Sequence, residues 1–405
     1  MSYGSIMKRL QRLEFPDCTR EALEFITETF SSQEGAAIPG LGGDKEPILA
    51  EVCQAFVLFG SKRSTKKLSA LQELQLLQLL CEHFRTALEK TKYQIFNLMF
   101  GARGDEQANT LLTKLVSMAL SVSCTSVLDC AAIWMQDRNS HSSDSLQLTK
   151  QLVEDYCLLF PDPSNMFQKL PSISPLFVCN FTTSVTSVFP FHDVESIPPA
   201  SLLEHVTTWI TSDCTLCCES VRQVAIHGTC SSPVPGLLGW CVLGPIICSH
   251  LMKPGSSAAS ASNKPHSQMY KPSVTKTMTT LSKLHLGLLQ SLDFCQSSSL
   301  SHCLLSVTDA MCLVKQLSTL LDRVRESQSD SGVKVEEDEV THITLERLAQ
   351  VLQVAKMAGC LRAQLGQLPE LGKVVKKHLP HNRLLSMVIA QHSERSSRHT
   401  PMDIS

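Results

Sequence analysis

The sequence predicts an all-α protein, and three observations support this prediction. Apolar residues recur at steps of three and four, the spacing of one helix face. Short polar connections separate the apolar stretches, and prolines mark several of the boundaries. The clearest apolar series are Leu71, Leu74, Leu77, Cys81, Phe84 and Leu88, followed later in the chain by Leu281, Leu284, Leu288, Leu289 and Leu292.

A long succession of helices with short connections favours antiparallel neighbours. We therefore expect an α-solenoid of stacked helical hairpins, of the HEAT or armadillo kind. A fixed-period repeat is not visible in the sequence, and a multi-helix bundle remains the alternative. With 405 residues the chain is long enough for two or three domains.

Prolines mark the ends of several individual helices. Pro161 and Pro163 end a helix that contains Tyr156, whereas Pro198 and Pro199 precede a helix over 201–210, because proline fits a first helical turn. The stretch 175–191 is rich in β-branched residues and could be taken for a strand. Its large apolar residues share one helical stripe, so we predict a helix there. These residues are Phe177, Phe181, Val185 and Val188.

The stretch 224–252 lacks Asp, Glu, Lys and Arg and could be mistaken for a membrane span. A span needs about 20 predominantly apolar residues, but this stretch contains several prolines, glycines and polar residues. We therefore expect a buried interior helix, interrupted at Gly244 and Pro245, and no membrane association.

Composition shifts suggest an organisation into four parts. Residues 1–252 form an N-terminal helical repeat region, and 253–280 form a low-complexity linker or insertion that is rich in Ser, Ala, Pro and Thr. Residues 281–392 form a C-terminal helical region with a solvated acidic loop at 326–341. Residues 393–405 form a disordered tail.

Charge and cysteine content limit the functional classes. A net charge of -2 excludes a global basic field for nucleic acid or anionic membranes. The 17 cysteines are odd in number in a long chain, and most lie in apolar helical stretches, where cysteine behaves as a small hydrophobe. We therefore expect thiols in a reducing compartment. The first 15 residues lack the apolar block of a secretory signal.

One set of residues has the donor types of a metal site. Cys214, Cys217, His227 and Cys230 could together close a tetrahedral zinc site. The two pairs are close in sequence, however, and lack a glycine-rich or aromatic knuckle. Buried thiols on helices are therefore the favoured interpretation, and zinc is the alternative.

The basic cluster Lys62, Arg63, Lys66 and Lys67 precedes the helix that contains Leu71. It is most simply a solvated loop, with an acidic protein surface or nucleic acid as alternative partners. Aromatic residues that could stack on bases are absent from it, so we expect no direct nucleic-acid contact. Sequence motifs of metalloproteases, hydrolases and nucleotide-binding loops are also absent, so we predict no enzymatic activity and no cofactor.

The run SALQELQLLQLLC at 69–81 closely resembles the Integrator complex subunit 15 family. Seven further segments resemble the family in the same order along the chain. They are 111–120, 127–136, 152–157, 197–210, 282–290, 345–355 and 379–389.

This resemblance implies a non-catalytic helical subunit of Integrator, a nuclear assembly that attends RNA polymerase II and matures small nuclear RNA 3′ ends. It implies an adaptor that links the arm module, with subunits ten, thirteen and fourteen, to the rest of the complex. Other Integrator subunits would then be its direct partners, and RNA polymerase II an indirect one. The family pattern contains no metal motif near Cys214.

Overall fold

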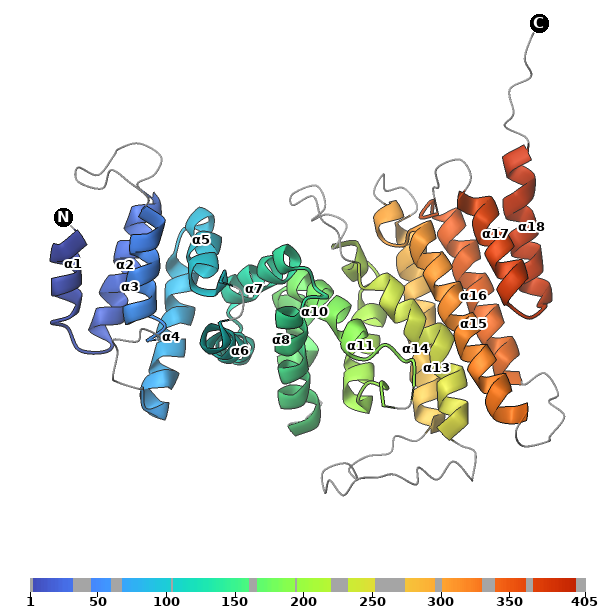
Figure 1. Cartoon of the computed structure of the whole chain (residues 1–405), viewed down its shortest axis with the longest axis horizontal. Helices are drawn as coiled ribbons and strands as arrows, with labels where there is room; N and C mark the ends of the chain where they lie inside the picture. Colours follow the sequence, from blue (N-terminus) through green and yellow to red (C-terminus); the bar gives the residue numbers. More distant parts are fainter. Residues whose placement is uncertain are drawn as a thin grey trace, which may run out of the picture. The chain divides into compact units, whose positions relative to one another are not determined.

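The structure is a computed structural model of the whole chain (Figure 1). It describes residues 3–31, 45–59, 68–102, 105–159, 166–193, 195–219, 232–251, 274–295, 301–329, 339–361 and 367–397. Throughout these ranges the regular elements are helices and no strand occurs, which confirms the predicted all-α class. The chain divides into two compact units, Met1–Phe181 and Thr182–Ser405.

In the first unit each helix packs on helices close to it in sequence. Helix α2 contacts α3 and α5, α4 contacts α6 and α7, and α6 contacts α8. Such local packing is compatible with stacked hairpins and with a bundle, so the solenoid stays a prediction. The elements are α1 (Tyr3–Leu10), α2 (Asp17–Ser31), α3 (Lys45–Phe56), α4 (Ala70–Thr86), α5 (Glu89–Phe100), α6 (Glu106–Ser121), α7 (Thr125–Arg138), α8 (Ser143–Val153), the π-helical η2 (Glu154–Leu159), the 3-10 turn η3 (Met166–Lys169) and α9 (Leu170–Ile173).

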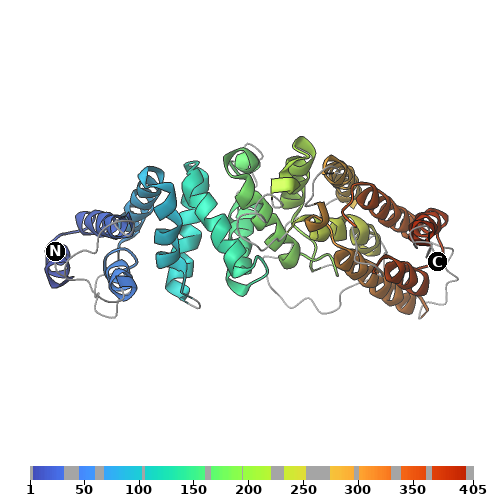
Figure 2. The same ribbon diagram turned by 90° about the horizontal axis from the view of Figure 1, so that it is seen from above.

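The second unit is built around α14, which contacts α11, α13 and α16. Helix α15 packs on α17, and α18 packs on α16 and α17; the orange-to-red helices in Figures 1 and 2 show this group. The elements are α11 (Ala200–Ser212), α13 (Val234–Leu251), α14 (Val274–Phe294), the 3-10 turn η4 (Ser301–Cys303), α15 (Val307–Ser329), α16 (Glu339–Met357), α17 (Gln367–His378) and α18 (Arg383–Ser397). Helix α10 (Pro175–Val188) confirms the predicted helix and crosses the boundary between the units.

Side-chain caps explain why several helices begin where they do. Ser69 and Gln72 form a capping box at the start of α4, with both reciprocal hydrogen bonds present. The Asp105 carboxylate accepts two backbone N–H groups at the start of α6, and the Ser142 hydroxyl caps α8. Each cap pairs backbone donors that the first helical turn cannot pair itself.

Helix α13 runs without a break through Pro245, so the predicted interruption at Gly244 and Pro245 is wrong. Proline has no N–H and cannot donate to the carbonyl four residues earlier, which here belongs to Cys241. Arg347 of α16 supplies the missing donor, because its Nη1 lies 2.7 Å from Cys241 O. A side chain from another helix thus compensates for the backbone defect.

The same helix uses a glycine for close packing. A Cβ added to Gly236 would overlap with the Cβ and Oγ1 of Thr186 in α10, whereas a Cβ on Gly239 would meet nothing within 4 Å. Gly236 therefore allows α13 to approach α10 more closely than any other residue would.

We expect Gly236→Ala to lower the free energy of unfolding by about 2 kcal/mol, because overpacking a core forces backbone shifts. Gly239→Ala is the matched control in the same helix. It should be neutral or stabilising by up to about 1 kcal/mol, since alanine favours the helix. Denaturant titrations of both variants, followed by tryptophan fluorescence, measure the difference. Equal stability of the two variants would contradict the close approach.

One described segment, Ser301–Glu326, is long and apolar enough to cross a membrane by length and composition. Within the folded unit, 56% of its most apolar window is buried. Core helices of folded domains pass the same test, so this segment is weak evidence for a span.

The predicted organisation into four parts stays a prediction, although the described helices bear on some of its bounds. The division between compact units falls at Phe181 and Thr182. Helix α14 begins at Val274, inside the stretch 253–280 that we expected to be a linker, because Thr277 and Leu281 are already buried against neighbouring helices. Helices α15 and α16 extend into the expected loop at 326–341, and α18 extends into the expected tail at 393–405. The remainder of these three segments lies outside the described residues.

Most described cysteines are buried thiols, as expected. Cys312 is an exception, because it lies exposed on α15. The structure also places the sulfur atoms of Cys218 and Cys295 next to each other. Their separation of 77 residues hides this proximity from the sequence; the packing of α14 on α11 brings them together.

Candidate protein-binding surfaces

Only two of the eight predicted site residues lie among the described residues. Lys62, Arg63, Lys66 and Lys67 lie outside them, and so do His227 and Cys230, whereas Cys214 and Cys217 are described. Burial raises the pKa of the Cys217 thiol to about 12. The described part of the chain contains no group of three or more His, Cys, Asp or Glu residues that could hold a metal. The zinc site and the basic cluster both stay predictions.

The first unit has a groove of about 600 Å³ between α4, α6 and α8. Its lining combines apolar side chains with hydroxyl and amide groups. The lining residues are Leu77, Thr110, Thr113, Lys114, Ser117, Met118, Ser121, Gln147, Gln151 and Asp155.

Polar contacts hold most of the charged and hydroxyl groups at this groove. Lys114 Nζ lies 2.6 Å from a carboxylate oxygen of Glu73, and the Gln151 amide donates to the Asp155 carboxylate over 3.0 Å. The Tyr156 hydroxyl donates to Ser117 O over 2.9 Å and joins η2 to α6. The groove therefore offers apolar and neutral polar contacts together with one carboxylate, that of Asp155.

The apolar stripe predicted on α4 is only partly a core stripe. Leu77 is buried, but Leu71 is 67% exposed and Leu74 is 43% exposed. Leu74 lies one helical turn before Leu77, which lines the groove. The first half of the stripe is thus exposed on a helix that lines the groove, which makes it a candidate contact.

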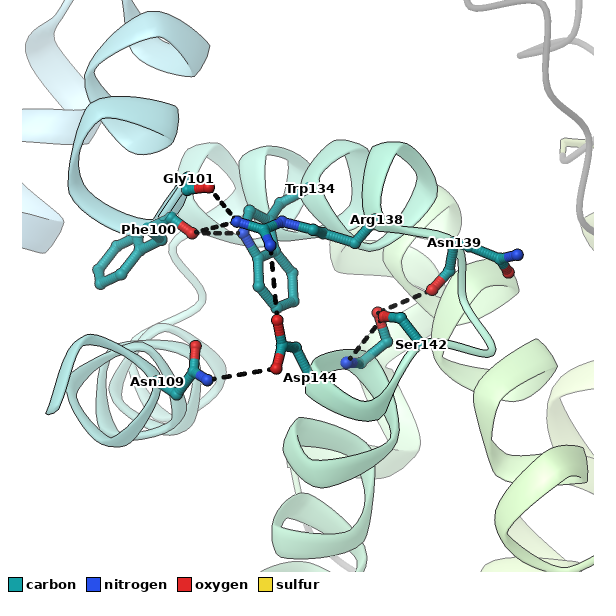
Figure 3. A network of polar contacts seen from close by, with 9 residues as sticks. Phe100, Gly101, Asn109, Trp134, Arg138, Asn139, Ser142 and Asp144 are labelled. Carbon is teal, nitrogen blue, oxygen red and sulfur yellow. Dashed lines mark hydrogen bonds and ion pairs between the residues drawn. The ribbon is translucent and has the colours of Figure 1, made fainter. Parts of the chain in front are cut away.

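A polar network holds α5, α7 and α8 together (Figure 3). The Arg138 guanidinium donates to the carbonyls of Phe100 and Gly101 at the end of α5, and it pairs with Asp144 in the first turn of α8. Trp134 Nε1 also donates to Phe100 O over 2.9 Å. The last carbonyls of α5, which lack partners within their own helix, are therefore capped by side chains of α7.

A second groove, of about 540 Å³, lies in the second unit between α11 and α14. Threonines dominate its lining, and Lys276 pairs with Glu204 over 2.6 Å. Like the first groove, it presents hydroxyl groups, and beyond the Lys276–Glu204 pair its lining contains one further charged residue, Lys283. The lining residues are Glu204, Thr207, Thr208, Thr275, Lys276, Thr279, Thr280 and Lys283.

A basic surface at the turn between α17 and α18 is not among the sites predicted from the sequence. Lys373, Lys376 and Lys377 are exposed on α17, and Arg383 is exposed at the start of α18. We call these four residues the basic turn. They are spread over a longer stretch of sequence than the compact run at 62–67, and only the helical spacing and the turn bring them together.

Comparison with known proteins agrees with the resemblance found in the sequence. A family model described as Integrator complex subunit 15 matches residues 4–377. Integrator complex subunit 15 of Homo sapiens is 32% identical, over 96% of this chain and 87% of the relative. The Danio rerio protein of that name is 31% identical, over 89% of this chain and 75% of the relative. The Drosophila melanogaster protein is 27% identical, over 94% of both chains. The chain therefore belongs to the Integrator complex subunit 15 family.

Proposed function

We propose that this protein is a non-catalytic scaffold or adaptor subunit of the nuclear Integrator complex. In this role it links the arm module, with subunits ten, thirteen and fourteen, to the rest of the complex. It thereby serves small nuclear RNA 3′-end processing and the regulation of transcription by RNA polymerase II. The observation that carries the proposal is the family match over 4–377, which spans both compact units.

The groove of the first unit supports an adaptor role. Most of its lining side chains are apolar or neutral and polar, its Lys114 is paired with Glu73, and the exposed Leu71 and Leu74 lie along α4, one wall of the groove. Such a surface suits the apolar face of an amphipathic helix. We propose that a helix of another Integrator subunit occupies it, with its apolar side chains on the two leucines.

Affinity purification from nuclear extract tests both statements. The tagged chain should recover Integrator subunits in near-stoichiometric amounts. The double variant Leu71→Asp/Leu74→Asp should reduce this recovery by about tenfold, because two carboxylates would be desolvated in the contact. Leu286→Asp is the control, since Leu286 is a similarly exposed leucine (61%) in the second unit.

The two parts of the proposal fail in different ways. A chain that purifies free of Integrator subunits would overturn the adaptor role. Normal recovery with Leu71→Asp/Leu74→Asp, in protein that keeps its helical circular dichroism, would overturn the groove as the contact.

A further inference from the structure

The three lysines of the basic turn share one face of α17. Their spacing of i, i+3 and i+4 places them on one side of the helix, and the buried Leu371 and Val375 lie on the other side. The only acidic residue of α17 is Glu370, whose carboxylate lies 3.6 Å from Lys373 Nζ. Among the described residues, no ion pair involves Lys376, Lys377 or Arg383.

Only some of the four cations are at positions where they stabilise their own helix. Lys376 and Lys377 lie in the last turn of α17, where the helix dipole favours cations. Arg383 is the first residue of α18, where the dipole opposes a cation, and the first turn of α18 contains no acidic residue. The chain thus places a fourth cation next to the lysines at a position that is unfavourable for its own helix.

The backbone around the basic turn is held in place. The Ser318 hydroxyl of α15 donates to His378 O over 3.2 Å at the end of α17. The buried Asn382 caps α18, because its side-chain oxygen accepts the Leu385 N–H over 3.0 Å. Residues 379–382 connect the two helices, so Arg383 follows Lys377 directly after the turn. The four cations are therefore presented by a fixed surface, which reduces the entropy lost on binding.

An apolar residue accompanies the charge. Met387 is 53% exposed and lies one turn after Arg383 on α18, on the same face. Phe, Trp and Tyr, on which the bases of single-stranded nucleic acids commonly stack, are absent from the sequence of both helices, 367–397. A partner that combines carboxylates with an apolar side chain fits this surface better than RNA does.

We propose that the basic turn binds an acidic segment of a partner protein, with carboxylates on Lys373, Lys376, Lys377 and Arg383 and an apolar side chain on Met387. This interaction goes beyond the adaptor role proposed above, because it uses a different surface and a different recognition chemistry. It should be strong at low salt and weaken as salt increases, since exposed charges are screened.

The first test uses the isolated full-length chain and a fluorescein-labelled peptide in which Leu recurs among Asp and Glu residues. Lys376→Glu/Lys377→Glu should weaken peptide binding by about tenfold, equivalent to about 1.4 kcal/mol. The control variant Lys8→Glu/Lys169→Glu makes the same charge change at exposed lysines of the first unit and should bind normally. Met387→Ser, which keeps every charge, should weaken binding by a smaller factor.

A labelled oligouridylate serves as the competing probe. Tighter binding of this RNA than of the peptide, with loss in Lys376→Glu/Lys377→Glu, would overturn the protein partner in favour of nucleic acid. Equal peptide binding by the two double variants would overturn the site. Neither result depends on whether the chain assembles with Integrator.

A second test uses the native assembly. A carbodiimide joins lysine amines to carboxylates that touch them, so it should link Lys373, Lys376 or Lys377 to Asp or Glu residues of another Integrator subunit. These links should disappear in Lys376→Glu/Lys377→Glu, while links from other lysines persist. Assemblies that contain the chain but show no such links would also overturn the proposal.

Discussion

Replacing Arg347 with methionine should destabilise the second unit by about 2 to 3 kcal/mol, because one buried backbone carbonyl would lose its hydrogen-bond donor. Arg347 is buried, and it donates to Cys241 O over 2.7 Å and to Ser282 Oγ over 2.8 Å. Methionine has similar length but no donor. The Cys241 carbonyl would then have neither Arg347 nor a helical N–H, and an unpaired buried polar group costs roughly 1 to 3 kcal/mol. Chemical denaturation with fluorescence of Trp209 and Trp240 measures the loss.

A second substitution separates this mechanism from a loss of packing. Pro245→Ala restores the N–H that Cys241 O lacks. In this background Arg347→Met should be nearly neutral or even stabilising, since it removes a buried cation whose pKa burial lowers. The double-mutant cycle should therefore show a coupling of at least about 1.5 kcal/mol. If Arg347→Met costs the same in the wild type and in the Pro245→Ala background, the arginine does not act through the carbonyl.

The relation between Arg347 and Pro245 shows what the sequence could predict and what it could not. Helical periodicity correctly predicted helices in both units, because each amphipathic stripe is a local property. The interruption predicted at Gly244 and Pro245 was also a local inference, and it was wrong because the compensating donor lies 106 residues from the carbonyl that it pairs. Sequence spacing contains no information about such a contact before the fold is known.

The candidate surfaces show the same limit. Leu71 and Leu77 belong to one periodic series, but only the packing of α6 and α8 decides that the first is exposed and the second is buried. The pattern of an apolar stripe is the same for a core and for an interface. The basic turn could have been found in the sequence by marking Lys373, Lys376, Lys377 and Arg383 on predicted helices, because the spacing of three and four between the lysines is visible there.

The second large effect is expected at Arg138, whose guanidinium joins the end of α5 to the start of α8 (Figure 3). Its side chain is 9% exposed and that of Asp144 is 18% exposed. Arg138→Met would remove the charge partner of Asp144 and the donor to Gly101 O. Breaking a buried pair by removing one partner costs about 3 to 5 kcal/mol, and we expect about 3 kcal/mol here because the Asp144 carboxylate keeps partial access to water and a contact to Asn109 at 3.5 Å.

A variant that keeps the charge of Arg138 but not the shape of its guanidinium tests which of the two properties stabilises the network. Arg138→Lys keeps the positive charge, but one ammonium group cannot reach Phe100 O, Gly101 O and Asp144 together, since only the planar fork of arginine presents donors in several directions. The loss of stability in Arg138→Lys should therefore be more than half of the loss in Arg138→Met. Arg20 is the control: its pair with Asp17, at 3.8 Å, is exposed, so Arg20→Met should change stability by less than about 1 kcal/mol.

Amide hydrogen exchange measured by mass spectrometry locates the effect of Arg138. In Arg138→Met the amides of α5, α7 and α8 should exchange faster together, because the network joins these three helices and opening of one exposes the others. Helices α15 to α18 belong to the other compact unit and should keep their protection. If Arg138→Lys matches the wild type, the pairing of charges alone stabilises the network. If instead exchange rises only at the end of α5, then Arg138 is a local cap of that helix and the wall of the groove does not depend on it.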